Sequence, residues 1–196
     1  MIKVTKMSRI QIPTDLIGRN VYLRETALDD CNQNYLGWLN DEESNRYFDT
    51  RLSKQSLKTI YEFIEKTNSS VDSYLCAIVN KKSGNHIGNV KVGPIHPFYK
   101  RAEISYFIGD KSQRGKGCAT EAVALMTKFA FRDLKVHKLR GLVREFNIGS
   151  KIVLEKNGYV LEGILRKEEK YDQNSEWEDV YSYALLNNEY FINNSF

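Results

Sequence analysis

The residue types best suited to chemistry occur in one short run, Arg114-Gly115-Lys116-Gly117-Cys118-Ala119. An alternating strand pattern over 104–108 precedes it, and a helical pattern follows it. A turn between a strand and a helix start leaves backbone N–H groups without intrahelical partners. With the positive end of the helix dipole, these groups form a site for an anion, most naturally a phosphate. Gly115 and Gly117 let a ligand reach the main chain, because glycine has no Cβ.

Two common phosphate-binding motifs do not fit this run. A nucleoside-triphosphate loop requires G-x-x-x-x-G-K-[ST], but one residue too many separates Gly109 from Gly115. Gly117 also occupies the position of the Ser or Thr that binds magnesium. A dinucleotide fingerprint that starts at Gly115 ends on Thr120 instead of glycine, and no clear βαβ unit precedes it.

The pattern that fits is [Q/R]-x-x-G-x-[G/A], formed by Arg114, Gly117 and Ala119. It resembles the pyrophosphate-binding turn of the GNAT superfamily of N-acetyltransferases. Its position, after an alternating strand and at the head of a long amphipathic helix, makes the resemblance more specific. The alternative is a glycine-rich loop that only turns the chain.

The composition is typical of an ordinary globular protein, with 41% apolar and 28% charged residues. A length of 196 residues predicts a single domain over 1–196, with its core from about 18 to 187. The net charge of +4 is too small to indicate nucleic-acid binding, although it suits a basic groove for a polyanionic cofactor. No secretion signal or membrane-spanning run is found, so we expect a cytoplasmic protein without a membrane partner.

Three cysteines, Cys31, Cys76 and Cys118, are odd in number and form no C-x-x-C pair. This argues against a disulfide framework and favours a reducing compartment. Cys118, inside the central turn, is interpreted as a small filler rather than a nucleophile. The three histidines have no metal-ligand spacing, so we predict no metal.

Hydrophobic periodicity predicts a mixed α/β sheet. After a loose lead-in over 1–17, we expect strands over 19–25, 73–80, 86–95, 104–108, 138–144, 159–166 and 177–186. We expect helices over 29–40, capped by Asp29 or Asp30, and over 41–49, 53–68, 119–132 and 147–156. Apolar stripes are predicted at Leu57, Ile60, Tyr61 and Ile64, and at Ala119, Ala122, Val123, Met126, Phe129 and Ala130.

This order resembles the GNAT fold from Gly18 to about Leu186, a mostly antiparallel, twisted central sheet flanked by helices. Within the superfamily the chain is most similar to the RimJ/RimL-like branch. The stretches that carry the resemblance, besides the central turn, are VYLRETALDD, WLNDEESNRY, NIGSKIVLEKNGY and LEGILR…DVYSYALL.

The resemblance implies an N-acetyltransferase, in which an amine attacks the thioester of acetyl-CoA directly through a tetrahedral intermediate. Main-chain N–H groups from Arg114 to Ala119, together with Thr120, would hold the pyrophosphate, with Arg114 and Lys116 adding charge. The open edge of the central strand at Tyr106, Phe107 and Ile108 would pair with the pantetheine and supply an N–H for the oxyanion.

The resemblance also implies roles near the helix that begins at Asn147. Asn147 can cap that helix and bind the pantetheine as well. Many superfamily members place a tyrosine as general acid where this chain has Leu154. Either Ser150 or water would therefore protonate the leaving thiolate.

The best general base is Glu103, acting directly or through water. The alternative is a strand-end ion pair with Lys100 or Arg101, and His96 is a second base candidate.

The acceptor site should be walled by residues 38–51 and by the hairpin 167–176, by analogy with the superfamily. Acidic side chains in both segments would attract a cationic amine or form solvated surface. We expect a small amine such as an amino sugar as acceptor, and a monomer or homodimer. The alternatives are a protein N-terminal acetyltransferase of the ribosomal-protein type and a non-catalytic acyl-CoA-binding regulator.

Overall fold

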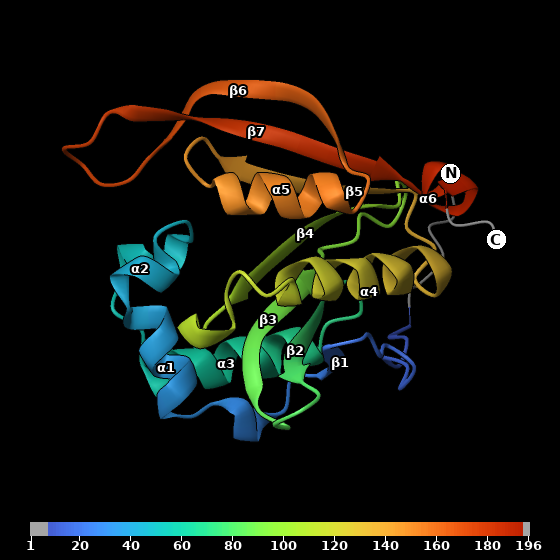
Figure 1. The fold of residues 1–196 in the computed structure, drawn as a ribbon, viewed down its shortest axis with the longest axis horizontal. Coiled ribbons are helices and arrows are strands. Elements are labelled where there is room, and N and C mark those ends of the chain that lie inside the picture. Colours follow the sequence, from blue (N-terminus) through green and yellow to red (C-terminus); the bar gives the residue numbers. More distant parts are fainter. Residues whose placement is uncertain (1–7, 194–196) are drawn as a thin grey trace.

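The computed structural model describes residues 8–193, and no helix in that range is long and apolar enough to cross a bilayer. Its centre is a seven-stranded sheet in the order β1-β2-β3-β4-β5-β7-β6 (Figure 1). The strands are β1 (Val21–Glu25), β2 (Tyr74–Asn80), β3 (His86–Val92), β4 (Arg101–Ile108), β5 (Lys138–Arg144), β6 (Val160–Lys170) and β7 (Trp177–Leu186). All neighbours are antiparallel except β4 and β5, so the predicted mixed, mostly antiparallel sheet is confirmed.

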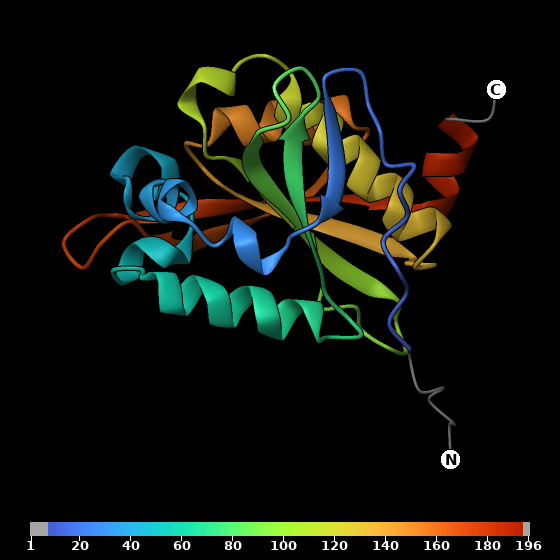
Figure 2. The ribbon, with the colours of Figure 1, turned by 90° about the horizontal axis from the view of Figure 1, so that it is seen from below.

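Helices cover both faces of the sheet (Figure 2). They are α1 (Gln33–Asn40), α2 (Glu42–Asn45), α3 (Leu57–Asn68), α4 (Cys118–Arg132), α5 (Ile148–Lys156) and α6 (Asn187–Asn193). Short 3-10 turns are η1 (Leu28–Asp30), η2 (Asp49–Leu52) and η3 (Lys111–Gln113). In Figure 2, α3 lies on one side of the sheet, and α4 and α5 lie on the other. Helix α6 was not predicted.

Each face of the sheet has its own apolar core. The larger core includes the α4 stripe, in which Met126 and Phe129 are fully buried as predicted and Ala119 is only partly buried. The smaller core joins Ile60 and Ile64 of α3 to Leu75 of β2. Each fully buried side chain of this size contributes roughly 1.5–3 kcal/mol.

The remaining predicted members of the α3 stripe, Leu57 and Tyr61, are exposed. The buried face of α3 is therefore narrower than its spacing suggested.

Two predicted helix starts are wrong. Asp30 does not cap α1, because its carboxylate accepts hydrogen bonds from Arg24 and from the Ala27 N–H, and it ends η1 instead. Asn32 caps α1 by accepting from the N–H groups two and three residues later. Helix α3 begins after Ser56, not at Ser53, because the Ser56 hydroxyl caps it.

The lead-in predicted over 1–17 is not loose where the structure describes it, although residues 1–7 lie outside the described range. Leu16 is fully buried. The Arg9 guanidinium donates to the Ser73 carbonyl at 3.1 Å and also pairs with Glu25. Residues 8–16 are therefore attached to the edge of the sheet.

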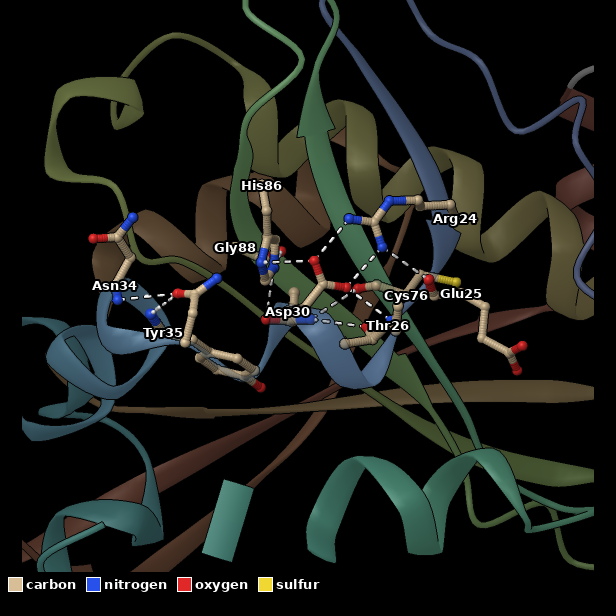
Figure 3. A network of polar contacts seen from close by, with 12 residues as sticks. Arg24, Glu25, Thr26, Asp30, Asn34, Tyr35, Cys76, His86 and Gly88 are labelled. Carbon is tan, nitrogen blue, oxygen red and sulfur yellow. Dashed lines mark hydrogen bonds and ion pairs between the residues drawn. The ribbon is translucent and has the colours of Figure 1, made fainter. Parts of the chain in front are cut away.

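A polar network joins β1, η1 and β3, and its Asp30 and His86 side chains are buried (Figure 3). Both carboxylate oxygens of Asp30 accept from Arg24 at 2.7 Å, and the His86 ring lies 3.6 Å from the same carboxylate. Burial lowers the pKa of His86, although Asp30 opposes this effect. Asn89 extends the network by donating to the Thr26 hydroxyl at 3.1 Å.

Candidate active site

The central turn has the geometry of an anion site. Gly115 and Gly117 have φ values of 71° and 80°, a left-handed conformation that disfavours any residue with a Cβ. The N–H groups from Gly115 to Gly117 donate to no protein acceptor within residues 8–193. The first N–H groups of α4, those of Cys118, Ala119 and Thr120, lack intrahelical partners by helix geometry. The predicted row of free donors is therefore present from Gly115 to Thr120, but not at Arg114, whose N–H donates to the Lys111 carbonyl.

Arg114 differs from the expectation for a phosphate-binding side chain. Its guanidinium donates to the Ile108 carbonyl at 3.0 Å, to Glu43 at 2.9 Å and to the Ser44 hydroxyl at 2.7 Å. Its own N–H donates to the carbonyl of Lys111. Arg114 thus links the turn to α2, and its positive charge is paired with Glu43.

Lys116, by contrast, is exposed at the turn. Its ammonium is in no ion pair with a described residue. Lys116 is therefore the cation available at this position. Cys118 is buried, which raises the pKa of its thiol and agrees with its interpretation as a filler.

The predicted open edge of β4 also exists. Residues 104–108 pair with β3 on one side, but β4 pairs with β5 only from Arg101 to Glu103. Beyond Glu103 the two strands diverge, and β5 continues with β7 as its partner. The main chain of Tyr106, Phe107 and Ile108 is therefore free of any strand on the β5 side within the described chain.

A cavity of about 90 Å³ lies in this opening. Tyr106 and Ser150 line it, and their hydroxyl oxygens are 2.8 Å apart. Burial raises the pKa of Tyr106 to about 12. Asn147 caps α5 as predicted, because its side-chain oxygen accepts from the Ser150 N–H at 3.2 Å. Leu154 is buried and lines the cavity, and a leucine there offers no hydroxyl as a general acid.

The structure does not bring Glu103 or His96 into this cavity. Glu103 forms an ion pair with Arg140, rather than with the predicted Lys100 or Arg101, and its side chain is 48% exposed. Glu103 and His96 line a separate surface hollow.

A second pocket, of about 210 Å³, lies on the other face of β4 beneath α3. It adjoins the first cavity, because Phe48, Ser105 and Tyr106 line both. The predicted acceptor wall over 38–51 contributes Leu39, Phe48 and Thr50 to this pocket. The hairpin contributes Glu169 to the first cavity.

Two arginines that the sequence interpretation missed hold these walls together. Arg51 donates to the carbonyls of Phe48 and Lys170 at 2.9 and 2.6 Å. Arg144, almost fully buried, pairs with Glu169 at 2.6 Å. In Figure 1 the hairpin between β6 and β7 extends on the left above α2.

The Tyr106 side chain was also missed, although a pattern pointed to it. It alternates with Ile104 and Ile108 on the face that packs towards the following helix.

Comparison with known proteins gives a consistent result. The family model described as "Acetyltransferase (GNAT) domain" matches residues 20–160. A Bacillus subtilis (strain 168) protein named "Probable N-acetyltransferase YjcK" is 34% identical over 183 residues, which cover 88% of this chain and 97% of that protein. The ribosomal-protein-serine acetyltransferase of Escherichia coli (strain K12) is 30% identical over 105 residues, covering 54% of this chain and 57% of the relative.

Solved structures share the fold. A Vibrio cholerae spermidine N-acetyltransferase in complex with CoA and spermine has a TM-score of 0.76 and 22% identity, covering 88% of this chain and 98% of that one. A GNAT-family acetyltransferase from Bacillus anthracis has a TM-score of 0.75 and 21% identity, covering 89% and 99%.

Proposed function

This chain belongs to the GNAT family of acetyltransferases, and we propose that it transfers the acetyl group of acetyl-CoA to the primary amine of a small molecule. The observation that carries the proposal is the row of free N–H groups from Gly115 to Thr120, beside the open edge of β4. A long substrate with a diphosphate at one end and amides along its length matches both features.

Acetyl-CoA would be held by main-chain groups in this proposal. The N–H groups at the head of α4 would bind the diphosphate, and Lys116 would add positive charge. The pantetheine amides would pair with the edge of Tyr106, Phe107 and Ile108, as another strand would, and Asn147 would contact the same arm. An N–H on this edge would stabilise the developing oxyanion, and one such donor is typically worth roughly 3 kcal/mol.

The reaction moves two protons as well as the acetyl group. A carbon–nitrogen bond forms while the carbon–sulfur bond breaks, so the amine loses a proton and the thiolate gains one. We assign the second transfer to Ser150, supported by its hydrogen bond with Tyr106. For the first we keep Glu103, acting through water: it lines a separate hollow and pairs with Arg140, but it shares a face of β4 with Ser105, which lines both cavities.

A small acceptor suits the pocket beneath α3 better than a protein N-terminus. At about 210 Å³, with aromatic and aliphatic side chains around it, the pocket is below the usual size for drug-sized ligands. A peptide acceptor would need an extended groove leading into the same place.

The test combines acetyl-CoA with a panel of small amines and N-terminal peptides, and measures thiol release and product mass. We expect thiol release with at least one small amine and a product whose mass has increased by one acetyl group in place of hydrogen. Tight acetyl-CoA binding with no thiol release for any amine or peptide would favour the non-catalytic regulator. Release with peptides alone would favour the N-terminal acetyltransferase.

A further inference from the structure

We infer that the amine acceptor also carries an anionic group, a phosphate or a carboxylate, which pairs with Lys91 in the pocket beneath α3. This inference rests on the proposed function and narrows its substrate class.

The position of Lys91 follows from strand register. Lys91 on β3 lies opposite Ser105 on β4 and opposite Leu75 on β2. Leu75 packs against α3 in the smaller core, so Lys91 is on the same face of the sheet. Residues directly opposite in antiparallel strands have Cβ atoms about 4.5–5.5 Å apart, which places Lys91 one strand away from β4.

The charge of the pocket has one sign. Among the described residues that line it, Lys91 is the only one with an ionised side chain. Within residues 8–193, no carboxylate lies within ion-pairing distance of the Lys91 ammonium. Lysines elsewhere on the molecule do have such partners, for example Lys111 with Asp41 and Lys138 with Glu162. A partly buried cation facing a pocket without a counter-ion favours an anionic ligand.

Several carboxylates around this pocket are already held in ion pairs. Glu169, in the adjoining cavity, is held by Arg144 at 2.6 Å. Glu103, further along the same face of β4, is held by Arg140. The acidic side chains that the sequence suggested for attracting a cationic amine include Asp41 and Glu43, and both pair with Lys111 outside the pocket.

A second observation also points to a polar ligand. The Thr50 hydroxyl oxygen is buried and has no hydrogen-bond partner within the described residues, and Thr50 lines the pocket. Buried hydroxyl groups are normally hydrogen-bonded, so an oxygen-rich group on a ligand would satisfy Thr50. Thr59, another hydroxyl-bearing residue of the pocket wall, differs from Thr50, because its hydroxyl already donates to Gln55 and to the Ser56 carbonyl.

This class of acceptor excludes polyamines, which carry cations only. The solved structure with spermine bound belongs to a protein that shares this fold at 22% identity. The pocket of this chain presents the positive charge of Lys91, which would repel a spermine-like cation.

The experiment compares matched amine pairs that differ in one anionic group. Glucosamine against glucosamine 6-phosphate tests a phosphate, and cadaverine against lysine tests a carboxylate. We expect the anionic member of at least one pair to have a kcat/KM about tenfold higher or more, the size of one charge-assisted hydrogen bond. Lys91→Gln should bring that ratio close to one, and Lys91→Glu should reverse it. Lys82→Gln, an exposed lysine in the β2–β3 turn, should keep the wild-type ratio.

Wild-type preference for the uncharged or cationic member of both pairs, or an unchanged ratio in Lys91→Gln, would overturn the inference and leave the acetyltransferase proposal standing. If acetyl-CoA binds and no amine releases thiol, the proposed function fails. Calorimetry with both amine pairs then decides the inference, and equal binding of the two members in each pair, or no binding, would overturn it.

Discussion

The hydrogen bond between Tyr106 and Ser150 gives the most informative prediction about the chemistry. If it only supports the fold, removing one hydroxyl costs about 1 kcal/mol of stability, the usual net value of a hydrogen bond, and changes kcat little. If Ser150 is the general acid, the loss in kcat is at least about a hundredfold. The two cases differ enough for one set of variants to separate them.

The variants are Ser150→Ala, Tyr106→Phe and the double substitution. We expect Ser150→Ala to lower kcat by about a hundredfold or more while the KM for acetyl-CoA rises less. The double variant should be little worse than Ser150→Ala alone, because residues that act as a unit are not additive. Initial rates of thiol release at saturating acetyl-CoA provide kcat, and thermal unfolding of each variant shows whether it is folded.

The pKa of Tyr106 adds a check on pH. Because burial raises it to about 12, the phenol keeps its proton throughout pH 6–10. Deprotonation of Tyr106 therefore should not reduce activity in that range. Wild-type kcat and an unchanged pH profile in Ser150→Ala would remove Ser150 from the mechanism.

Three further predictions concern Arg114, Arg51 and the buried His86. Arg114→Gln should raise the KM for acetyl-CoA several-fold with a smaller change in kcat, because the central turn loses its ties to α2; equal KM values would show that the turn holds its shape alone. Arg51→Ala should lower the free energy of unfolding by about 2–4 kcal/mol, since three carbonyls lose a buried charged donor, whereas an unchanged denaturation midpoint would contradict this. Burial lowers the pKa of His86, so the unfolded chain takes up its proton first as the pH falls. Stability should decrease below about pH 6.5, the usual pKa of histidine, and His86→Asn should flatten that decrease in urea titrations.

The parts of the fold that could be predicted from the sequence depend on local patterns. The central strand, turn and helix form one continuous stretch of sequence. The two turn residues with positive φ, Gly115 and Gly117, can be recognised in the sequence by their residue type. The Asn147 cap needs only contacts within three residues, and it is confirmed. The divergence of β4 from β5 was expected only from the resemblance to the GNAT fold, because a local sequence pattern does not determine which strands pair.

The parts that could not be predicted depend on contacts between distant segments. Arg51 contacts a hairpin about 120 residues away, and no local pattern marks it. Arg114 was expected to face a phosphate, but Glu43 and Ser44 compete for its guanidinium. Lys91 belongs to no sequence motif. Its place in the pocket follows only from the strand register, which puts it opposite Ser105.

The binding of coenzyme A at the central turn is the claim on which the account depends most. A crystal structure of the protein with CoA tests it most directly. The account predicts the diphosphate within hydrogen-bond distance of the N–H groups from Gly115 to Thr120, and the pantetheine beside Tyr106, Phe107 and Ile108. Density for CoA at any other place on the molecule would contradict it.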